Sequence, residues 1–230
     1  MTRVVERASG RVKPGMVRAE YIEVERNVRL HITDAGEGRS IVLIHGWPLA
    51  VLVGFSMGGS IAIHFASMDK GAHVSKLVLC AAAAPVWTQR NDFQYNLPVS
   101  AVDELIELSY TDRPLLLSNF GKIFAATETA LNEGIRNWLN GINLSASSYA
   151  TTQCLIALRD TDLRGDLAGI TIPTLIMHGK KDKICSFDLA EQMKTAIRHS
   201  HIVAFENSGH SLFLEETPRF NAELIKFSSI

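Results

Sequence analysis

The sequence predicts an α/β fold, a mostly parallel sheet flanked by helices, with a helical cap over one edge of the sheet. Three observations predict it. Short apolar runs typical of strands buried on both faces recur along the chain, and several end in polar, glycine-containing loops. Amphipathic helical patterns separate most of these runs, as crossovers between parallel strands require. The long stretch 86–164 has helical patterns and no strand signal, which indicates an insertion.

Composition limits the classes of function. The chain has 230 residues, of which 47% are hydrophobic and 20% charged, as expected for one globular domain with an insertion. Its formal net charge of −1 argues against nucleic acid or a membrane surface as partner. No apolar run reaches the roughly 18 residues of a spanning helix. Three cysteines without metal-type spacing, Cys80, Cys154 and Cys185, favour a reducing, cytoplasmic location.

The chain divides into an arm, a core and a cap. Residues 1–18 are rich in charge and lack periodicity, so we expect an N-terminal arm. Residues 19–85 and 165–230 form the predicted core, which begins with a β-hairpin turning at Arg26–Asn27. Residues 86–164 form the predicted cap. Capping residues and apolar periodicity predict its helices near 100–109, from 111 onward, and near 127–139 and 145–159.

A serine stands between a strand pattern and a helix pattern. The apolar run Val51–Phe55 leads into Gly-x-Ser-x-Gly at residues 54–58, with Ser56 at its centre. Such a sharp turn exposes a nucleophilic serine, and we expect Gly54 and Gly58 to provide the room it needs. The Met57 N–H would then point at a developing oxyanion, aided by the helix dipole. A purely structural glycine turn is the alternative, but the flanking strand and helix favour the nucleophile.

A second loop could complete an oxyanion hole. The run Ile41–Ile44 reads as a buried strand, and it ends in His45–Pro48. Loops that follow parallel strands lie at the carboxyl edge of the sheet, where open α/β sheets bind ligands. Taken alone, these residues are better explained as a turn with Trp47 packed on the core. Beside the serine turn, they predict that the Trp47 N–H pairs with the Met57 N–H on one negative charge.

Two further residues follow strand patterns on the same edge. Asp182 comes just after the run 173–177, and His210 just after 202–205. Either residue alone could lack a catalytic role, because aspartate is common in turns and six of the eight histidines have no role in this interpretation. The chain order Ser56, Asp182, His210, with all three at one sheet edge, instead predicts a nucleophile, a general base and the acid that orients it.

The chain resembles the α/β-hydrolases, and within them bacterial arylesterases and cofactor-free haloperoxidases (perhydrolases). The likeness runs from about residue 19 to 227 and rests on residues 45–49, 53–59, 162–164, 173–175, 178–179, Asp182 and 209–210. It implies Ser56 as nucleophile, His210 as base, Asp182 as its orienter, and Trp47 and Met57 as oxyanion donors. It also implies that neither a metal nor another cofactor is needed. Where relatives usually have a proline after the acid, this chain has Cys185–Ser186.

We therefore expect a serine hydrolase that cleaves small carboxylic esters through an acyl-enzyme, with perhydrolysis as a side activity. Its partner would be a small-molecule ester, and no pattern specifies an oligomeric state. A C–C bond hydrolase with the same triad is one alternative. A catalytically inactive or ligand-sensing relative is another.

One departure from these families is large. In them about fifty residues separate the oxyanion loop from the serine turn, whereas here only Leu49 and Ala50 join Pro48 to Val51. A crossover between parallel strands takes a dozen or more residues, and five extended residues reach only about 17 Å. Three explanations are open: the 230-residue sequence omits a segment, the segment is truly deleted, or the two strands pair differently. We favour the first.

Overall fold

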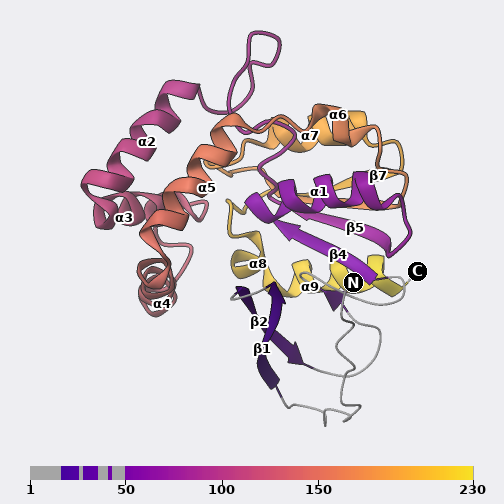
Figure 1. Cartoon of the computed structure of the whole chain (residues 1–230), viewed down its shortest axis with the longest axis horizontal. Coiled ribbons are helices and arrows are strands. Elements are labelled where there is room, and N and C mark those ends of the chain that lie inside the picture. Colours follow the sequence, from indigo (N-terminus) through magenta and orange to yellow (C-terminus); the bar gives the residue numbers. More distant parts are fainter. Residues whose placement is uncertain (1–16, 26–27, 36–40, 43–49, 230) are drawn as a thin grey trace. The chain divides into compact units, whose positions relative to one another are not determined.

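A computed structural model describes residues 17–25, 28–35, 41–42 and 50–229 (Figure 1). The chain forms two compact units, residues 1–40 and 41–230, which are considered separately. The loop that holds Trp47 lies outside the described residues, and so does the predicted arm up to residue 16. The predicted division into arm, core and cap therefore stays a prediction.

The first unit contains the predicted hairpin. Strand β1 (Val17–Glu25) pairs antiparallel with β2 (Val28–Ala35), and Tyr21 lies opposite His31. The register shifts between Glu23 and Glu25, just before the turn. Alternation of apolar and polar residues identified both strands correctly.

The second unit is built on a parallel sheet of five strands in the order β3-β4-β5-β6-β7. Its strands are β3 (Ile41–Val42), β4 (Ala50–Phe55), β5 (Val74–Cys80), β6 (Thr174–Gly179) and β7 (Ser200–Phe205). Strands β3 and β4 are parallel neighbours, with Ile41 opposite Val51. This pairing excludes the explanation that the two strands around the short connection pair in some other way.

Helices cover both faces of this sheet (Figure 1). Helix α1 (Met57–Asp69), the short α6 (Arg164–Leu167) and α7 (Phe187–Ala196) share one apolar cluster with the sheet. Helices α8 (Leu212–Glu215) and α9 (Thr217–Ser229) pack on the other face through Phe213, Phe220 and Phe227. Because both faces are covered, all six residues of β6 are buried.

Five helices lie between β5 and β6 in the described chain, and the first four of them lie together (Figure 1). These four are α2 (Val99–Thr111), α3 (Arg113–Ile123), α4 (Glu133–Ser145) and α5 (Ser148–Asp160). Side-chain oxygens of Asp112, Asn132 and Ser147 cap α3, α4 and α5 at their first turns. A third apolar cluster, which includes Trp87, Val102 and Ile184, joins this insertion to the loop after β6.

The predicted helix near 127–139 is wrong in its first part. Helix α4 begins only at Glu133, after the Asn132 cap. In the preceding segment the Ala130 N–H donates to the Thr127 carbonyl at 3.2 Å, a bond between residues three apart that forms a turn. The Asn132 side chain then caps the first turn of α4 by accepting from the Ile135 N–H at 3.0 Å.

Candidate active site

Ser56 has the strained backbone expected of a nucleophile turn. Its φ and ψ are 52° and −121°, a region that non-glycine residues rarely adopt. The Ser56 N–H donates to the Cys80 carbonyl at 3.0 Å, and the Ser56 carbonyl accepts from Gly59 and Ala83 at 2.9 and 3.0 Å. These bonds hold the strained conformation between β4, β5 and the first turn of α1.

The glycines around Ser56 differ from one another. A Cβ on Gly54 would lie 2.5 Å from the Gly58 carbonyl oxygen and 2.8 Å from the Ala62 Cβ, so the turn requires glycine there. A Cβ on Gly59 would overlap the Ala82 side chain. A Cβ on Gly58 would meet no described atom within 4 Å. Among the described residues the close approach needs Gly54 and Gly59, and the expectation that Gly58 provides room stays a prediction.

Asp182 and His210 form a buried pair. Asp182 follows β6 and His210 follows β7, and His210 Nδ1 lies 2.8 Å from Asp182 Oδ2. Both side chains have no exposed surface. Because an ionised carboxylate can only accept, Nδ1 carries the proton and Nε2 keeps its lone pair. That Nε2 is buried and has no hydrogen-bond partner among the described residues.

A second histidine, His178, also contacts this pair. Its Nε2 donates to the Cys185 carbonyl at 2.8 Å and lies 3.4 Å from Asp182 Oδ2. The other Asp182 oxygen accepts from the Ile184 and Cys185 N–H groups at 2.8 and 2.9 Å. Burial acts to raise the pKa of Asp182, but the hydrogen bonds from His178 and His210 outweigh it and hold that pKa below its usual value. Asp182 is therefore ionised at neutral pH.

The loop after Asp182 is fixed from the insertion side as well. Trp87 Nε1 donates to the Ile184 carbonyl at 3.0 Å, and the Ser186 N–H donates to Asn96 Oδ1 at 2.9 Å. A proline at position 186 could not make the second bond, because it has no N–H. The bond from the Ser186 N–H to Asn96 therefore ties the loop after Asp182 to the segment that follows β5.

Aromatic rings connect His210 with the serine turn. The His210 ring centroid lies 4.9 Å from that of Phe55, which directly precedes Ser56. It lies 5.7 Å from that of Phe124, which follows α3. The structure thus places His210, which follows β7, beside Phe55, the last residue of β4, at the carboxyl edge of one parallel sheet.

A largely apolar cavity of about 570 Å³ opens onto Ser56. Its walls come from the segment after β5, the insertion helices and the loop after Asp182; among them are Trp87, Leu105, Leu117, Phe120, Leu155 and Ile184. Cys154, the one cysteine of the three that is not fully buried, also lines it. Burial raises the pKa of the Cys80 thiol to about 12, so Cys80 is protonated.

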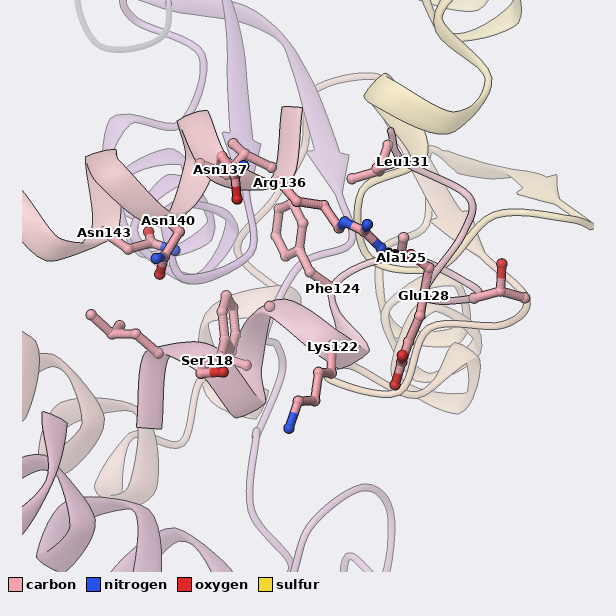
Figure 2. Close-up of a pocket in the computed structure, with 15 residues that line it drawn as sticks. Ser118, Lys122, Phe124, Ala125, Glu128, Leu131, Arg136, Asn137, Asn140 and Asn143 are labelled. Carbon is pink, nitrogen blue, oxygen red and sulfur yellow. Dashed lines mark hydrogen bonds between the residues drawn. The ribbon is translucent and has the colours of Figure 1, made fainter. Parts of the chain in front are cut away.

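A second cavity of about 320 Å³ lies between α3 and α4 (Figure 2). It is more polar, with Arg136, Asn137 and Asn140 of α4 near Ser118 and Lys122 of α3. It shares Leu117, Phe120 and Asn143 with the first cavity, so these side chains separate the two.

The two predicted oxyanion donors differ in what the structure describes. Met57 is the first residue of α1, so its N–H has no acceptor within the helix. Trp47 lies outside the described residues.

Nowhere in the described part of the chain do three or more His, Cys, Asp or Glu side chains gather as a metal site. None of the helices described is long and apolar enough to cross a membrane.

The chain belongs to the α/β-hydrolase fold family, whose sequence profile matches residues 39–217. A Bacillus subtilis protein named AB hydrolase superfamily protein YisY is 36% identical, over 91% of this chain and 98% of its own length. A protein from Synechocystis, named putative non-heme chloroperoxidase, is 30% identical over 77% of this chain and 66% of its own. The predicted fold class and the resemblance to esterases and haloperoxidases are therefore confirmed.

Solved structures agree with these relatives. An esterase from Exiguobacterium antarcticum is 45% identical, with a TM-score of 0.76 over 80% of this chain and 68% of its own. A bromoperoxidase from Bacillus anthracis is 28% identical, with a TM-score of 0.77 over the same shares of the two chains. The chain is thus an α/β-hydrolase with esterase and haloperoxidase relatives.

The alignment with the Bacillus subtilis relative also bears on the short connection before Ser56. It extends over 266 positions but contains only 91% of this 230-residue chain, or about 209 residues. About 57 aligned positions therefore have no counterpart here. This number agrees with the roughly fifty residues that the sequence lacks relative to the family.

Proposed function

We propose that this protein is a carboxylic ester hydrolase that uses Ser56, His210 and Asp182. The observation that carries the proposal is the buried Asp182–His210 hydrogen bond of 2.8 Å, which leaves His210 Nε2 unpaired beside the strained serine turn. A base with a free lone pair and a serine that opens onto a cavity are what nucleophilic catalysis requires. The esterase and haloperoxidase relatives support the same class of reaction.

The reaction proceeds in two acyl transfers. His210 Nε2 takes the Ser56 proton as Oγ attacks the ester carbonyl, and Asp182 stabilises the imidazolium. The N–H groups of Met57 and Trp47 stabilise the oxyanion. His210 then gives its proton to the leaving alcohol, which departs and leaves an acyl-enzyme. Water, deprotonated by His210, attacks the acyl carbon, and His210 returns that proton to Ser56 Oγ as the acyl–Oγ bond breaks and the acid is released. Hydrogen peroxide in place of water would release a peracid.

The cavity at Ser56 favours esters with an apolar acyl group. Leucine, isoleucine and aromatic side chains form most of its wall, and 570 Å³ holds an acyl chain of several carbons. A C–C hydrolase would use the same three residues, but the similar Exiguobacterium antarcticum structure is named an esterase. Ester hydrolysis is therefore the better fit.

A serine-directed phosphonate and a short p-nitrophenyl ester together test this proposal. The wild-type protein should be labelled once, at Ser56, and should hydrolyse the ester. Ser56→Ala should abolish labelling and lower kcat by about 10⁴, because nucleophile and base act as one unit. Ser67→Ala is a matched control, because Ser67 lies on the same helix α1 and bonds Asp166 instead of facing the site. Ester hydrolysis retained in Ser56→Ala would contradict the assignment, and an unlabelled wild type would favour an inactive relative.

A further inference from the structure

Glu215, the last residue of α8, joins two separate parts of the site. Its Oε1 accepts from the Ala126 N–H at 2.8 Å, in the segment between α3 and α4. Its Oε2 accepts from the Gly209 N–H at 2.9 Å and from the Ser211 hydroxyl at 2.9 Å. Glu215 Oε2 thus binds the two residues that flank His210, and Glu215 Oε1 binds the insertion.

The segment around Ala126 is in close contact with the His210 loop. The Ser211 N–H donates to the Phe124 carbonyl at 2.9 Å, and the Phe124 ring packs against the His210 ring. A Cβ on Gly209 would lie 2.5 Å from the Ala126 nitrogen, so the two backbones touch and no side chain fits between them. Phe124 and Ala125 also line the second cavity (Figure 2).

We propose that Glu215 is a positioning residue, which sets the place of His210 by tying its loop to the insertion. The inference rests on the proposed function, in which His210 is the general base. Asp182 fixes only the Nδ1 side of the ring, whereas Nε2 has no partner among the described residues to hold it. The position of Nε2 relative to Ser56 therefore depends on the backbone at Gly209 and Ser211, and both residues bond Glu215.

An amide cannot replace this carboxylate. The three donors approach from both oxygens, so a glutamine must turn its NH₂ group toward Ala126 or toward Gly209. In either orientation one backbone N–H faces another donor and loses its acceptor. The Ser211 hydroxyl alone could adapt, because a hydroxyl can also accept.

The test compares kcat, KM and melting temperature for the wild type, Glu215→Gln and a matched control, Asp166→Asn. Asp166 also accepts tertiary bonds, from His64 and Ser67, but it ties α6 to α1 and contacts neither His210 nor the insertion. With a short p-nitrophenyl ester, Glu215→Gln should lower kcat about tenfold and change KM by less than about twofold, since small displacements of a catalytic group act mainly on the chemical step. Asp166→Asn should leave kcat unchanged.

A second variant covers the case in which Glu215→Gln does not fold. Ser211→Ala removes one donor to Glu215 and keeps both backbone bonds, and it should lower kcat by about threefold at unchanged KM. The rate of phosphonate labelling at Ser56 should fall in parallel in both Glu215→Gln and Ser211→Ala, whereas loss of stability alone would not change the rate in the folded fraction.

Wild-type kcat in folded Glu215→Gln, or in Ser211→Ala when Glu215→Gln is unfolded, would overturn the positioning role while leaving the proposed function intact. An equal loss of kcat in Asp166→Asn would also overturn it, because the effect would then be general. A wild type that neither hydrolyses esters nor takes the phosphonate would instead overturn the proposed function, and this inference with it.

Discussion

The serine turn and the Asp182–His210 pair lie at the same sheet edge, but they are held by different means. Ser56 is held by backbone alone, in a conformation of positive φ fixed by three backbone hydrogen bonds and by close packing at Gly54 and Gly59. Asp182 and His210 are held by side-chain bonds, of which some are local, from His178 and from Glu215 to Gly209, and some join distant segments, from Trp87 to Ile184 and from Glu215 to Ala126.

The two parts of the site therefore differ in how much of their geometry comes from neighbouring residues and how much from tertiary contacts. The pattern that marks the strained turn lies within about ten positions between a strand and a helix, although Cys80 and Ala83 also bond its backbone. The acid–base pair depends on buried hydrogen bonds in which each partner would be costly to leave alone. Substitutions at the pair should therefore act through chemistry and charge, and those at the turn through packing and strain.

Asp182→Asn should produce the largest effect of the substitutions that compare the two regions. An asparagine oxygen can still accept from His210, but the amide carries no charge and can also turn its NH₂ toward Nδ1, which would reverse the tautomer. We expect kcat on a p-nitrophenyl ester to fall by about 10³, somewhat less than for loss of Ser56 or His210. Stopped-flow or steady-state kinetics on the folded variant would measure it, and a loss below tenfold would contradict the role of Asp182.

Gly54→Ala and Gly58→Ala form a matched pair at the serine turn. The added methyl group overlaps backbone at Gly54 but meets no described atom at Gly58. Gly54→Ala should lower the free energy of unfolding by about 3 kcal/mol, as overpacking does. Gly58→Ala lies in the first turn of α1 and should change it by less than about 1 kcal/mol. Urea unfolding of both variants measures this difference, and equal losses would contradict the packing described here.

The same distinction explains how much of the site could be predicted from sequence. Gly-x-Ser-x-Gly and the strand ends before Asp182 and His210 are local patterns, and they identified three residues that the structure brings to one sheet edge. His178 and Glu215 carry no such pattern, because their partners are 4 to 89 positions away and no periodicity marks them. The late start of α4 was missed because the Asn132 side chain caps the helix there, and Asn132 was not identified as a cap from the sequence.

The conflict between the short connection before Ser56 and a parallel pairing of its two flanking strands could be predicted from sequence, because it depends only on how far five residues can reach. Parallel pairing of β3 with β4 confirms the premise of that argument, and about 57 positions of the Bacillus subtilis relative have no counterpart here. Two explanations remain open, an omitted segment and a true deletion. The intact mass of the purified protein separates them, because an omitted segment would add roughly fifty residues to the 230 of this sequence.

Acid should destabilise the protein through Asp182. Its pKa is lowered in the folded state, so its contribution to stability is complete above the unfolded pKa of about 3.9 and is lost as the pH falls toward the folded value. Below about pH 4, the wild type should lose stability more steeply than Asp182→Asn, by up to about 1.4 kcal/mol per pH unit. Urea unfolding between pH 2.5 and 5 would show it, and parallel curves would contradict the lowered pKa.

Ser56→Gly should produce the smallest of these effects. Relative to Ser56→Ala it should raise the free energy of unfolding, whereas the other substitutions lower activity or stability. Ser56 adopts φ 52° and ψ −121°, and glycine adopts positive φ without the steric cost that a Cβ brings. Ser56→Ala keeps the Cβ and therefore the strain, so it is the reference. Glycine also has the larger conformational entropy in the unfolded chain, which offsets part of the gain. We expect Ser56→Gly to exceed Ser56→Ala in the free energy of unfolding by about 1 kcal/mol. Both variants lack the hydroxyl and should be equally inactive, so denaturation alone distinguishes them. A less stable Ser56→Gly would mean that the surrounding bonds, and not the backbone strain at Ser56, dominate the energetics of the turn.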